Sequence, residues 1–487
     1  MLFNSITFAI FFPIVFGLYW FVCYKQLKFQ NALLLVASYY FYANWDWRFL
    51  FLLIFSTLLD YYTGIKMSDT PNARTRKFWF ILSICINLGF LGIFKYYNFF
   101  VSSFADGLNV LGIHFNYRTL DVILPIGISF YTFHGLSYVI DIYKKRIPAE
   151  KNFIDYALFV SFFPLLVAGP IERATHLLPQ LKKARTFSYI KAADGLKQIL
   201  WGLFKKIVIA DQCAKYADLL FNNVGEYSGL SLVMGALFFT FQIYCDFSGY
   251  SDIALGTSRL LGIELLRNFA FPYFSRDIAE FWRRWHISLS SWFRDYLYIP
   301  LGGSMGSTWT KVRNTFIIFL ISGFWHGANW TFIIWGLLNA LYIMPSILFS
   351  TNRRNIDSVA QGKLFPSLKE LFAMMTTFGL TVFAWIFFRA PNIHLALTYI
   401  QRMFSQLFDA SSLAQAQQLF SLQIGWGLAI LLVLFLIIEW MGREYQYALA
   451  NIGIVWPKAV RWSFYYALII AIISFSESEQ QFIYFQF

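Results

Sequence analysis

The sequence predicts an all-α protein that crosses a membrane several times, and three observations support this. The chain is 58% hydrophobic and only 13% charged, whereas a soluble domain has roughly 25% charged residues. The apolar residues gather in stretches long enough for membrane helices, each of which needs about 20 residues. The basic residues, which give a net charge of +13, fall in short breaks between these stretches. That pattern is typical of positively charged cytoplasmic loops and argues against nucleic-acid binding.

The first apolar stretch covers residues 1–24 and has neither a basic region ahead of it nor a clear cleavage site. It therefore predicts a retained first helix rather than a signal peptide. The later apolar stretches are residues 33–62, 78–94, 122–143, 157–168, 196–210, 230–244, 314–352, 371–388, 426–438 and 462–475. Allowing for broken and paired helices, we expect about eleven crossings. We expect one integral-membrane domain over residues 1–487, with core motifs in 120–340 and a C-terminal helix and tail in 460–487.

The basic breaks lie at residues 25–28, 66–77, 144–151, 173–191 and 353–369. The third and fourth breaks flank only the short stretch 157–168, which is hard to reconcile with a full crossing. A re-entrant or slanted segment would keep both breaks on the cytoplasmic side. It would also place Pro164 and Gly169-Pro170 in a non-helical turn.

His326 is the strongest candidate for a functional residue. It lies in the stretch 314–352, which contains no Asp, Glu, Lys or Arg and is long enough for about two crossings. Ionisable groups at membrane depth are costly and mark functional sites by default, and histidine can move a proton near neutral pH. Gly323 and Gly327 are expected to loosen the backbone beside it, which a membrane tolerates only where the chain is buried in protein or lines a wet cavity.

Residues 281–296 form a second candidate segment, rich in tryptophan. On one continuous helix, a single face would carry Trp282, Trp285, His286, Leu289 and Phe293, with Arg283, Arg284, Arg294 and Asp295 away from its centre. Such a helix could lie at the membrane interface, with its tryptophans at headgroup level and its arginines reaching water. Alternatively, His286 faces the same cavity as His326, and the two histidines share the work of base and orienting group.

Asp246 and Asp252 interrupt an apolar run around Gly249, which we expect to break the helix. Carboxylates at such depth usually pair with Arg or a backbone donor, so a structural role is favoured. A third metal ligand cannot be identified, and we predict no metal site. The four cysteines lie in or beside apolar segments without a Cys-x-x-Cys pair, which argues against disulfides and zinc.

Several of these motifs together resemble the membrane-bound O-acyltransferase family, within it the bacterial branch of alginate and peptidoglycan O-acetyltransferases. They are residues 281–303, 325–330, 124–130, 168–173, 246–252 and 482–487. The resemblance implies tilted helices, with re-entrant and interfacial ones, around a central funnel or tunnel. It also implies a catalytic role for His326, which matches the family's conserved histidine, and makes His286 the match of a second, more variable one.

The resemblance further implies the partners of the reaction. An acyl thioester, either acetyl-CoA or an acyl carrier protein, would donate from the cytoplasmic side of a bacterial inner membrane. A separate periplasmic or extracellular O-acetyltransferase would serve the polysaccharide acceptor. The thioester is a co-substrate, and no bound cofactor is expected. The polymer stays open among alginate, peptidoglycan, cellulose and other exopolysaccharides.

Acyl transfer to a hydroxyl needs a base near the attacking oxygen and hydrogen-bond donors for the developing oxyanion. Neutral His326 can supply the base, because desolvation disfavours its charged form. Asn329, or backbone N–H groups freed after Gly327, could supply the donors. We expect the substrate-binding residues to be Trp282, Trp325, Asn329, Arg294 and Asp295.

The terminal residues 482–487 resemble the C-terminal motif of a small partner in the related D-alanylation machinery, where a tyrosine is proposed to carry the acyl group. By this resemblance Tyr484, activated near His326, would take the acyl group as an aryl ester and present it to an extracytoplasmic transferase. Alternatively, Tyr484 only anchors the last helix at the membrane interface.

Three other functions remain open at this point. A D-alanyltransferase acting on teichoic acid would share the architecture, as would a eukaryotic-type lipid or protein acyltransferase, although residues 282–286 and 327–330 look more like the acetylating branch. A transporter would also place charges at the midplane. However, the sequence has no paired repeat with corresponding broken helices in two halves.

Overall fold

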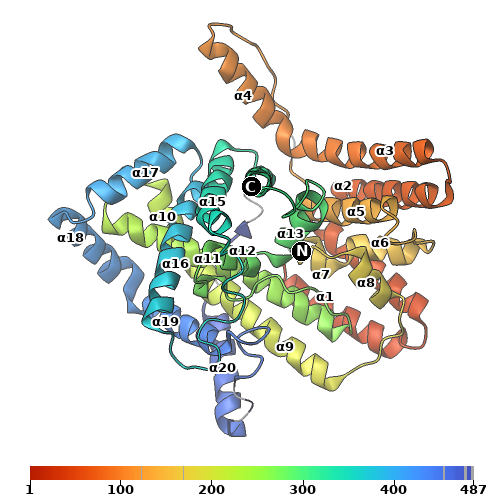
Figure 1. Cartoon of the computed structure of the whole chain (residues 1–487). Helices are drawn as coiled ribbons and strands as arrows, with labels where there is room; N and C mark the ends of the chain where they lie inside the picture. The colour runs from red at the N-terminus through yellow and green to blue at the C-terminus, as the bar shows by residue number, and fades with distance from the viewer. Residues whose placement is uncertain (122, 168, 453, 455, 477–479, 484–487) are drawn as a thin grey trace. The chain divides into compact units, whose positions relative to one another are not determined.

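The computed structural model describes the whole chain except residues 122, 168, 453, 455, 477–479 and 484–487. Over this part of the chain the regular structure consists of helices joined by loops, without a β-strand (Figure 1). The all-α prediction is therefore confirmed. The chain forms two compact units: unit 1 is Met1–Gly195 with Thr257–Leu266, and unit 2 is Leu196–Gly256 with Arg267–Phe487. The expected single domain over residues 1–487 stays a prediction.

Six helical stretches among the described residues are long and apolar enough to cross a membrane. They are Leu27–Asp69, Ala73–Val110, Leu230–Leu260, Trp330–Leu348, Leu368–Arg389 and Ala410–Gly442. A shorter apolar stretch, Ile6–Val22, precedes them. The polytopic membrane class is confirmed, whereas the number of about eleven crossings stays a prediction.

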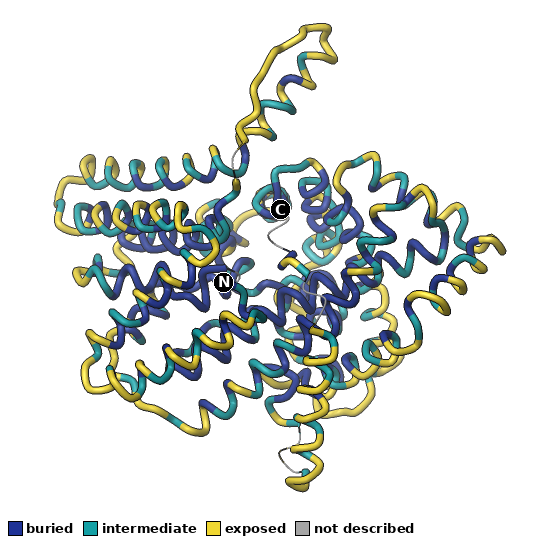
Figure 2. The backbone as a smooth tube through the Cα atoms, turned by 180° about the vertical axis from the view of Figure 1, so that it is seen from behind, coloured by how far each residue is buried: buried dark blue, intermediate teal, exposed yellow. Residues whose placement is uncertain are grey.

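Unit 1 contains the N-terminal helices. They are α1 (Ile6–Gly17), η1 (Leu18–Val22), α2 (Leu27–Asp69), α3 (Ala73–Leu91), η2 (Gly92–Tyr96), α4 (Tyr97–Val110), α5 (Ile128–Tyr143), α6 (Phe153–Ser161), α7 (Phe163–Leu166), α8 (Ala174–Leu181) and the first half of α9 (Tyr189–Leu203). Helix α4 projects away from the end of α3 (Figure 1), and Figure 2 shows that this projecting segment and the loop after it are largely exposed.

A buried carboxylate joins three helices of unit 1. Asp60 of α2 accepts hydrogen bonds from the Ser83 hydroxyl (2.6 Å) and the Asn87 amide (2.8 Å), both on α3. Gly135 of α5 faces the same carboxylate, and a Cβ at that position would overlap it. These contacts satisfy a polar group that apolar surroundings would otherwise leave without a partner, and they hold α2, α3 and α5 side by side.

The short stretch around residues 157–168 is not a full crossing, as the sequence predicts. It folds as α6, which has nine residues, and α7, which has four; nine residues of helix span about 14 Å, against a hydrocarbon core of about 30 Å. The expectation that Pro164 lies in a non-helical turn is wrong, because Pro164 occupies the first turn of α7. Proline is tolerated there since the first-turn N–H groups have no helical partner.

Unit 2 begins with the second half of α9 and contains most of the remaining helices. They are η3 (Phe204–Ala210), α10 (Asp211–Asn222), α11 (Leu230–Leu260), η4 (Pro272–Phe274), α12 (Ile278–Arg284), α13 (Ile287–Phe293), η5 (Arg294–Tyr298), α14 (Thr308–His326), α15 (Trp330–Leu348), α16 (Leu368–Arg389), α17 (Ile393–Ser405), α18 (Ala410–Leu419), η6 (Phe420–Ile424), α19 (Gly425–Gly442) and α20 (Lys458–Ser474). The last four residues of α11 belong to unit 1.

The helices α14 and α15 form a close antiparallel pair. Each has 19 residues, which is about 28 Å of helix. A Cβ at Gly323 would overlap the Phe332 carbonyl, and a Cβ at Gly336 would overlap the Phe319 carbonyl. Small residues at such a crossing let two helix backbones approach. The stretch 314–352 falls on these two helices, and the turn between them follows His326. Of the two, only α15 is among the six stretches above, so about two crossings here stays a prediction.

Candidate active site

His326 is the last residue of α14, and Gly327 after it is extended (φ −164°, ψ 150°). The expectation that Gly323 loosens the backbone is wrong, since the helix runs through it and its missing Cβ serves the contact with α15. Gly327 does end the helix, and a Cβ there would overlap the ring of Phe332. His326 is only 6% exposed. It is therefore a buried imidazole at the end of a helix, beside a turn in which a side chain at residue 327 would displace the Phe332 ring.

Aromatic rings surround His326. Its ring centroid lies 5.2 Å from that of Trp335 and 5.5 Å from that of Phe388, both with the rings steeply inclined. Trp335 belongs to a tryptophan cluster, which we define as Trp282, Trp285, Trp335 and Trp385. Neighbouring members have centroids 5.0 to 5.6 Å apart. These rings remove water from around the imidazole and fix its position.

Residues 281–296 do not form one continuous helix, so that prediction is wrong. The segment folds as α12, an interruption at Trp285 and His286, α13 and then η5. His286 adopts the left-handed conformation (φ 43°, ψ 54°). Asn268 accounts for the interruption: its carbonyl accepts the Ile287 N–H (2.9 Å). Its side-chain oxygen accepts the Ser288 hydroxyl (2.9 Å). The interfacial interpretation fails for Trp285, which is 1% exposed.

His286 is held in a defined orientation by Asn268. The Nδ1 atom of His286 lies 3.0 Å from Asn268 Oδ1. We assign the proton to Nδ1, because an amide oxygen can only accept; Nε2 is then left as an acceptor. His286 is buried against the ring of Phe247, whose centroid lies 4.7 Å away.

His286 lies outside the six membrane-crossing helices. Its burial lowers the pKa of His286 well below the usual range, and the neighbouring His326 lowers it further. The two histidines are thus close enough to influence one another's charge. The lowered pKa favours the neutral form of His286, which is the form that can accept a proton.

Three further residues predicted from the sequence are Asn329, Trp325 and Tyr484. Asn329 caps α15: its side-chain oxygen accepts the Thr331 N–H (3.0 Å), and its amide donates to the Pro391 carbonyl (2.7 Å). Both of its polar groups are therefore engaged in holding the turn. Trp325 is half-buried directly before His326. Tyr484 lies outside the described residues.

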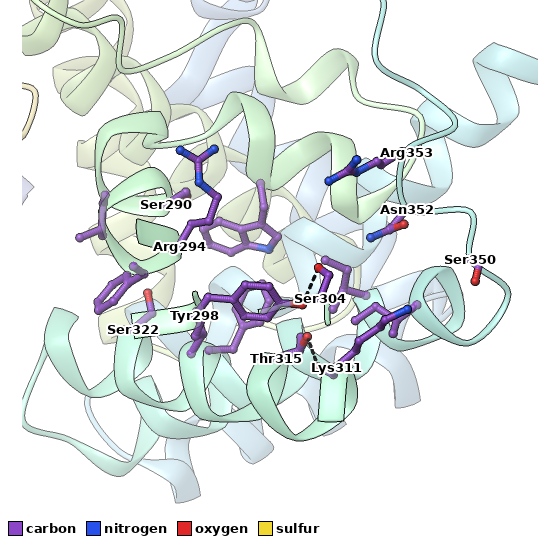
Figure 3. A pocket seen from close by; sticks show the side chains of 17 residues that line it. Ser290, Arg294, Tyr298, Ser304, Lys311, Thr315, Ser322, Ser350, Asn352 and Arg353 are labelled. Atoms are coloured by element: carbon purple, nitrogen blue, oxygen red, sulfur yellow. Dashed lines mark hydrogen bonds between the residues drawn. The ribbon is translucent and has the colours of Figure 1, made fainter. Parts of the chain in front are cut away.

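A cavity of about 510 Å³ opens beside this region (Figure 3). Three basic side chains line it, Arg294, Lys311 and Arg353, and its described lining contains no Asp or Glu. Arg294 also pairs with Asp295 (Nε to Oδ1, 2.8 Å), and 62% of its side chain is exposed. The cavity therefore has a positive potential and suits an anionic ligand.

The same cavity reaches toward His326. Trp282 lines it and also belongs to the tryptophan cluster, with its ring 5.6 Å from that of Trp335. Ser322, another lining residue, lies four residues before His326 on α14 and hence on the same helix face. Trp282 and Arg294 therefore share the cavity lining, and Trp282 is linked through Trp335 to the ring of His326.

Asp246 and Asp252 lie on an unbroken helix, so the predicted break at Gly249 is wrong. The missing Cβ at Gly249 instead admits the backbone of the η3 region, since a Cβ there would lie 2.7 Å from the Gly202 carbonyl oxygen. Lysines pair with both carboxylates. Lys205 Nζ is 2.6 Å from Asp252, and Lys206 Nζ is 2.8 Å from Asp246. The adjacent Lys205 and Lys206, which have apolar residues on both sides, were the signal that sequence reasoning missed. Over the described residues, no three His, Cys, Asp or Glu side chains come together as metal ligands.

Comparison with known proteins identifies the family. Residues 144–388 match the model of the membrane-bound O-acyltransferase (MBOAT) family. The chain is 40% identical to "Probable alginate O-acetylase AlgI" of Pseudomonas aeruginosa, covering 92% of this chain and 82% of that protein. It is 38% identical to the peptidoglycan O-acetyltransferase of Helicobacter pylori, covering 83% of this chain and 80% of that protein. A weaker similarity relates it to the teichoic acid D-alanyltransferase of Bacillus subtilis, with 28% identity over 55% of this chain and 69% of that protein. With buried histidines beside a basic cavity in a multi-pass helical protein, the chain belongs to the membrane-bound O-acyltransferase family and is an acyltransferase.

Proposed function

We propose that this protein takes an acetyl group from a cytoplasmic thioester and delivers it for O-acetylation of an extracytoplasmic polysaccharide. The observation that carries this proposal is the basic cavity that reaches the tryptophan cluster around His326. The acetyl group and the polysaccharide are supported by the alginate and peptidoglycan O-acetylating relatives, which match more than four fifths of the chain. D-alanyl transfer to teichoic acid is the second candidate, because the D-alanyltransferase match covers only 55% of the chain.

The cavity favours a thioester on a phosphate-bearing arm. Both coenzyme A and a carrier protein present the acyl group on a pantetheine arm with at least one phosphate. A volume of about 510 Å³ is in the range of pockets that hold a small-molecule ligand. Arg294, Lys311 and Arg353 would bind the phosphate, and the aromatic end would take the arm and its thioester. The nucleotide or the carrier protein would stay outside.

The histidines would carry out the proton transfer. As the acceptor hydroxyl oxygen attacks the thioester carbonyl, His326 takes the hydroxyl proton. The carbon–sulfur bond breaks, and the departing thiolate receives that proton from His326. His286, with its Nδ1–H bound to Asn268, would keep Nε2 as a second acceptor that can orient the hydroxyl or His326.

Tyr484 is the proposed first acceptor. Its phenol would form an aryl ester, which is more reactive than a sugar ester because phenol is the better leaving group. A separate extracytoplasmic transferase would then move the acetyl group to the polymer. Direct transfer from the thioester to the polymer, without the tyrosine, is the competing route.

The test uses cells that lack the gene and carry variant copies. His326→Ala should abolish ester-linked acetate on the polysaccharide while leaving the amount of membrane-inserted protein unchanged. His394→Ala is the matched control, since this histidine is exposed at the start of α17. Ester-linked acetate that persists in His326→Ala would contradict the proposal. Loss of ester-linked D-alanine instead of acetate would favour the second candidate. Full acetylation by Tyr484→Phe would favour direct transfer.

A further inference from the structure

The last described residues of the chain are buried in unit 2 rather than exposed. Phe482 and Ile483 are 1% and 0% exposed. Chain ends are usually poorly ordered unless specific contacts hold them. Here the contacts are identifiable: Ile483 donates its backbone N–H to Asp246 Oδ2 (2.7 Å), and Lys206 Nζ donates to the Gln480 carbonyl (3.1 Å). Two charged side chains therefore anchor both ends of the segment 480–483 by hydrogen bonds.

The same two side chains are paired with each other. Lys206 Nζ lies 2.8 Å from Asp246 and 2.8 Å from Asp211, and all three side chains are at most 4% exposed. A buried ion network is poor as a source of stability, because desolvation offsets the attraction between the charges. Its geometry is specific, however, because each charge must keep its partners. Such a network is better suited to fixing the position of a segment than to stabilising the fold.

The anchored segment 480–483 is separated from His286 by one aromatic ring. The centroid of Phe482 is 6.2 Å from that of Phe247, and Phe247 in turn is 4.7 Å from His286. Phe482 also packs on Tyr250 of α11, with centroids 4.8 Å apart. The segment that precedes Tyr484 in the chain is thus anchored beside the candidate active site.

We propose that Lys206 and Asp246 are positioning residues for the relay: they hold the segment 480–483 beside His286, and this anchoring speeds the acylation of Tyr484, the next residue in the chain. This inference rests on the proposed relay through Tyr484. It adds that the acylation of the tyrosine depends on a buried ion pair, whose Asp246 binds Ile483 across 237 residues of chain. Releasing the segment 480–483 would leave the histidines intact and slow the acylation of Tyr484.

The neighbouring ion pair provides a matched control. Lys205 and Asp252 are paired at 2.6 Å on the same two helical segments, with side chains 3% and 14% exposed. Lys205 also donates to the Ser248 hydroxyl, and Asp252 accepts from the Gln198 amide; neither hydrogen bond involves the segment 480–483. Removing this pair perturbs a buried charge in the same region and leaves the hydrogen bonds to the segment 480–483 in place.

The experiment compares Asp246→Ala and Lys206→Met with Asp252→Ala and Lys205→Met in purified full-length protein in nanodiscs. Hydrogen exchange of residues 480–483 should be faster in the first pair only. Labelled acetyl thioester should acetylate Tyr484 about 100-fold more slowly in the first pair, since small misplacements of a reacting group have effects of this size. Acetylation of a small added phenol needs the histidines but not the contacts of Lys206 and Asp246 with the segment 480–483. Its rate should stay near the wild-type value in both pairs, which shows that the variants are folded.

Equal labelling of Tyr484 in Asp246→Ala and Asp252→Ala would overturn the positioning role. So would an Asp246→Ala variant whose residues 480–483 exchange at the wild-type rate. Failure of the relay itself would appear in the wild-type protein, as no label on Tyr484 despite His326-dependent acetylation of the polymer. That outcome would remove the positioning role for a different reason, and the two failures are therefore distinguishable.

Discussion

His286 Nδ1 lies 3.0 Å from Asn268 Oδ1, and this contact sets both the chemistry and the backbone of the site. The amide oxygen accepts the Nδ1 proton, which leaves Nε2 as the acceptor. The same oxygen accepts the Ser288 hydroxyl at 2.9 Å, so it also holds the interruption between α12 and α13. Asn268 thereby fixes both the tautomer of His286 and the left-handed backbone conformation of this residue.

Replacing Asn268 with Ala should impair both functions. The rate of acyl transfer should fall roughly 10- to 100-fold, as is typical when the group that orients a functional histidine is lost. The free energy of unfolding should fall by about 1–3 kcal/mol, because buried donors lose their acceptor. Transfer rates and thermal unfolding in detergent measure the two effects. Asn223→Ala, which removes a hydrogen bond at the end of α10, is the control. A wild-type rate in Asn268→Ala would contradict the orienting role.

The lowered pKa of His286 predicts a dependence of stability on pH. Burial is the larger cause and His326 the smaller. The unfolded chain takes up a proton at this ring below about pH 6.5, whereas the native state does not, so the native state loses stability as the pH falls through 6.5. His286→Gln removes this contribution. Between roughly pH 7.5 and 5.5 the melting temperature should therefore fall more in the wild type than in His286→Gln. Parallel curves would show that His286 takes up its proton normally in the folded protein.

Gly327→Ala should distort the turn after His326. The added Cβ would overlap the ring of Phe332, and Phe332 packs on Phe388 with centroids 4.8 Å apart. Overpacking of this kind costs about 1–3 kcal/mol, and the shifted rings should also lower the transfer rate. Gly379→Ala is the control, because nothing lies within 4 Å of a Cβ there. It should leave the rate unchanged and raise stability by up to about 1 kcal/mol. Equal effects of the two substitutions on the rate would argue against the importance of this turn.

The cavity predicts an effect on donor affinity. Arg353→Ala should raise KM for the acyl thioester roughly tenfold with little change in kcat, since the arginine binds the donor equally before and during the reaction. The effect should shrink at high ionic strength, because Arg353 is exposed and screened. Arg354→Ala removes an adjacent exposed arginine that does not line the cavity. If the two variants have the same KM, the donor binds elsewhere.

Sequence periodicity predicted the parts of the fold that depend on local pattern. The uncharged stretch 314–352 is long enough for two helices, and His326 falls beside their connection. Periodicity could not predict the interruption at His286, because Asn268, 18 residues away, imposes it. Nor could it pair Lys206 with Asp246, since partners so far apart meet only when the helices pack. Asn329 is also the helix cap of α15, a role that is readable from sequence; its role as a donor for the oxyanion stays a prediction.

The relay through Tyr484 predicts that its hydroxyl oxygen carries the acetyl group. The segment before it in the chain is anchored one aromatic ring from His286. Tyr484→Phe removes only the hydroxyl oxygen that would carry the ester. We expect this variant to fold and insert normally and to lose at least tenfold of the polymer-bound acetate, roughly the loss expected when a covalent acceptor is removed. Normal acetate in the polymer would refute the relay and leave the role of His326 untouched.

The most direct test of the central claim follows the acetyl group in purified protein. Wild type and His326→Ala, each in nanodiscs, are incubated with labelled acetyl-CoA or a labelled acetyl carrier protein, and the label is mapped by intact mass and peptide sequencing. We predict label on Tyr484 of the wild type, with release of free thiol, and none on His326→Ala. Equal labelling of the two proteins, or passage of intact thioester without release of thiol, would contradict a His326-dependent acyl transfer.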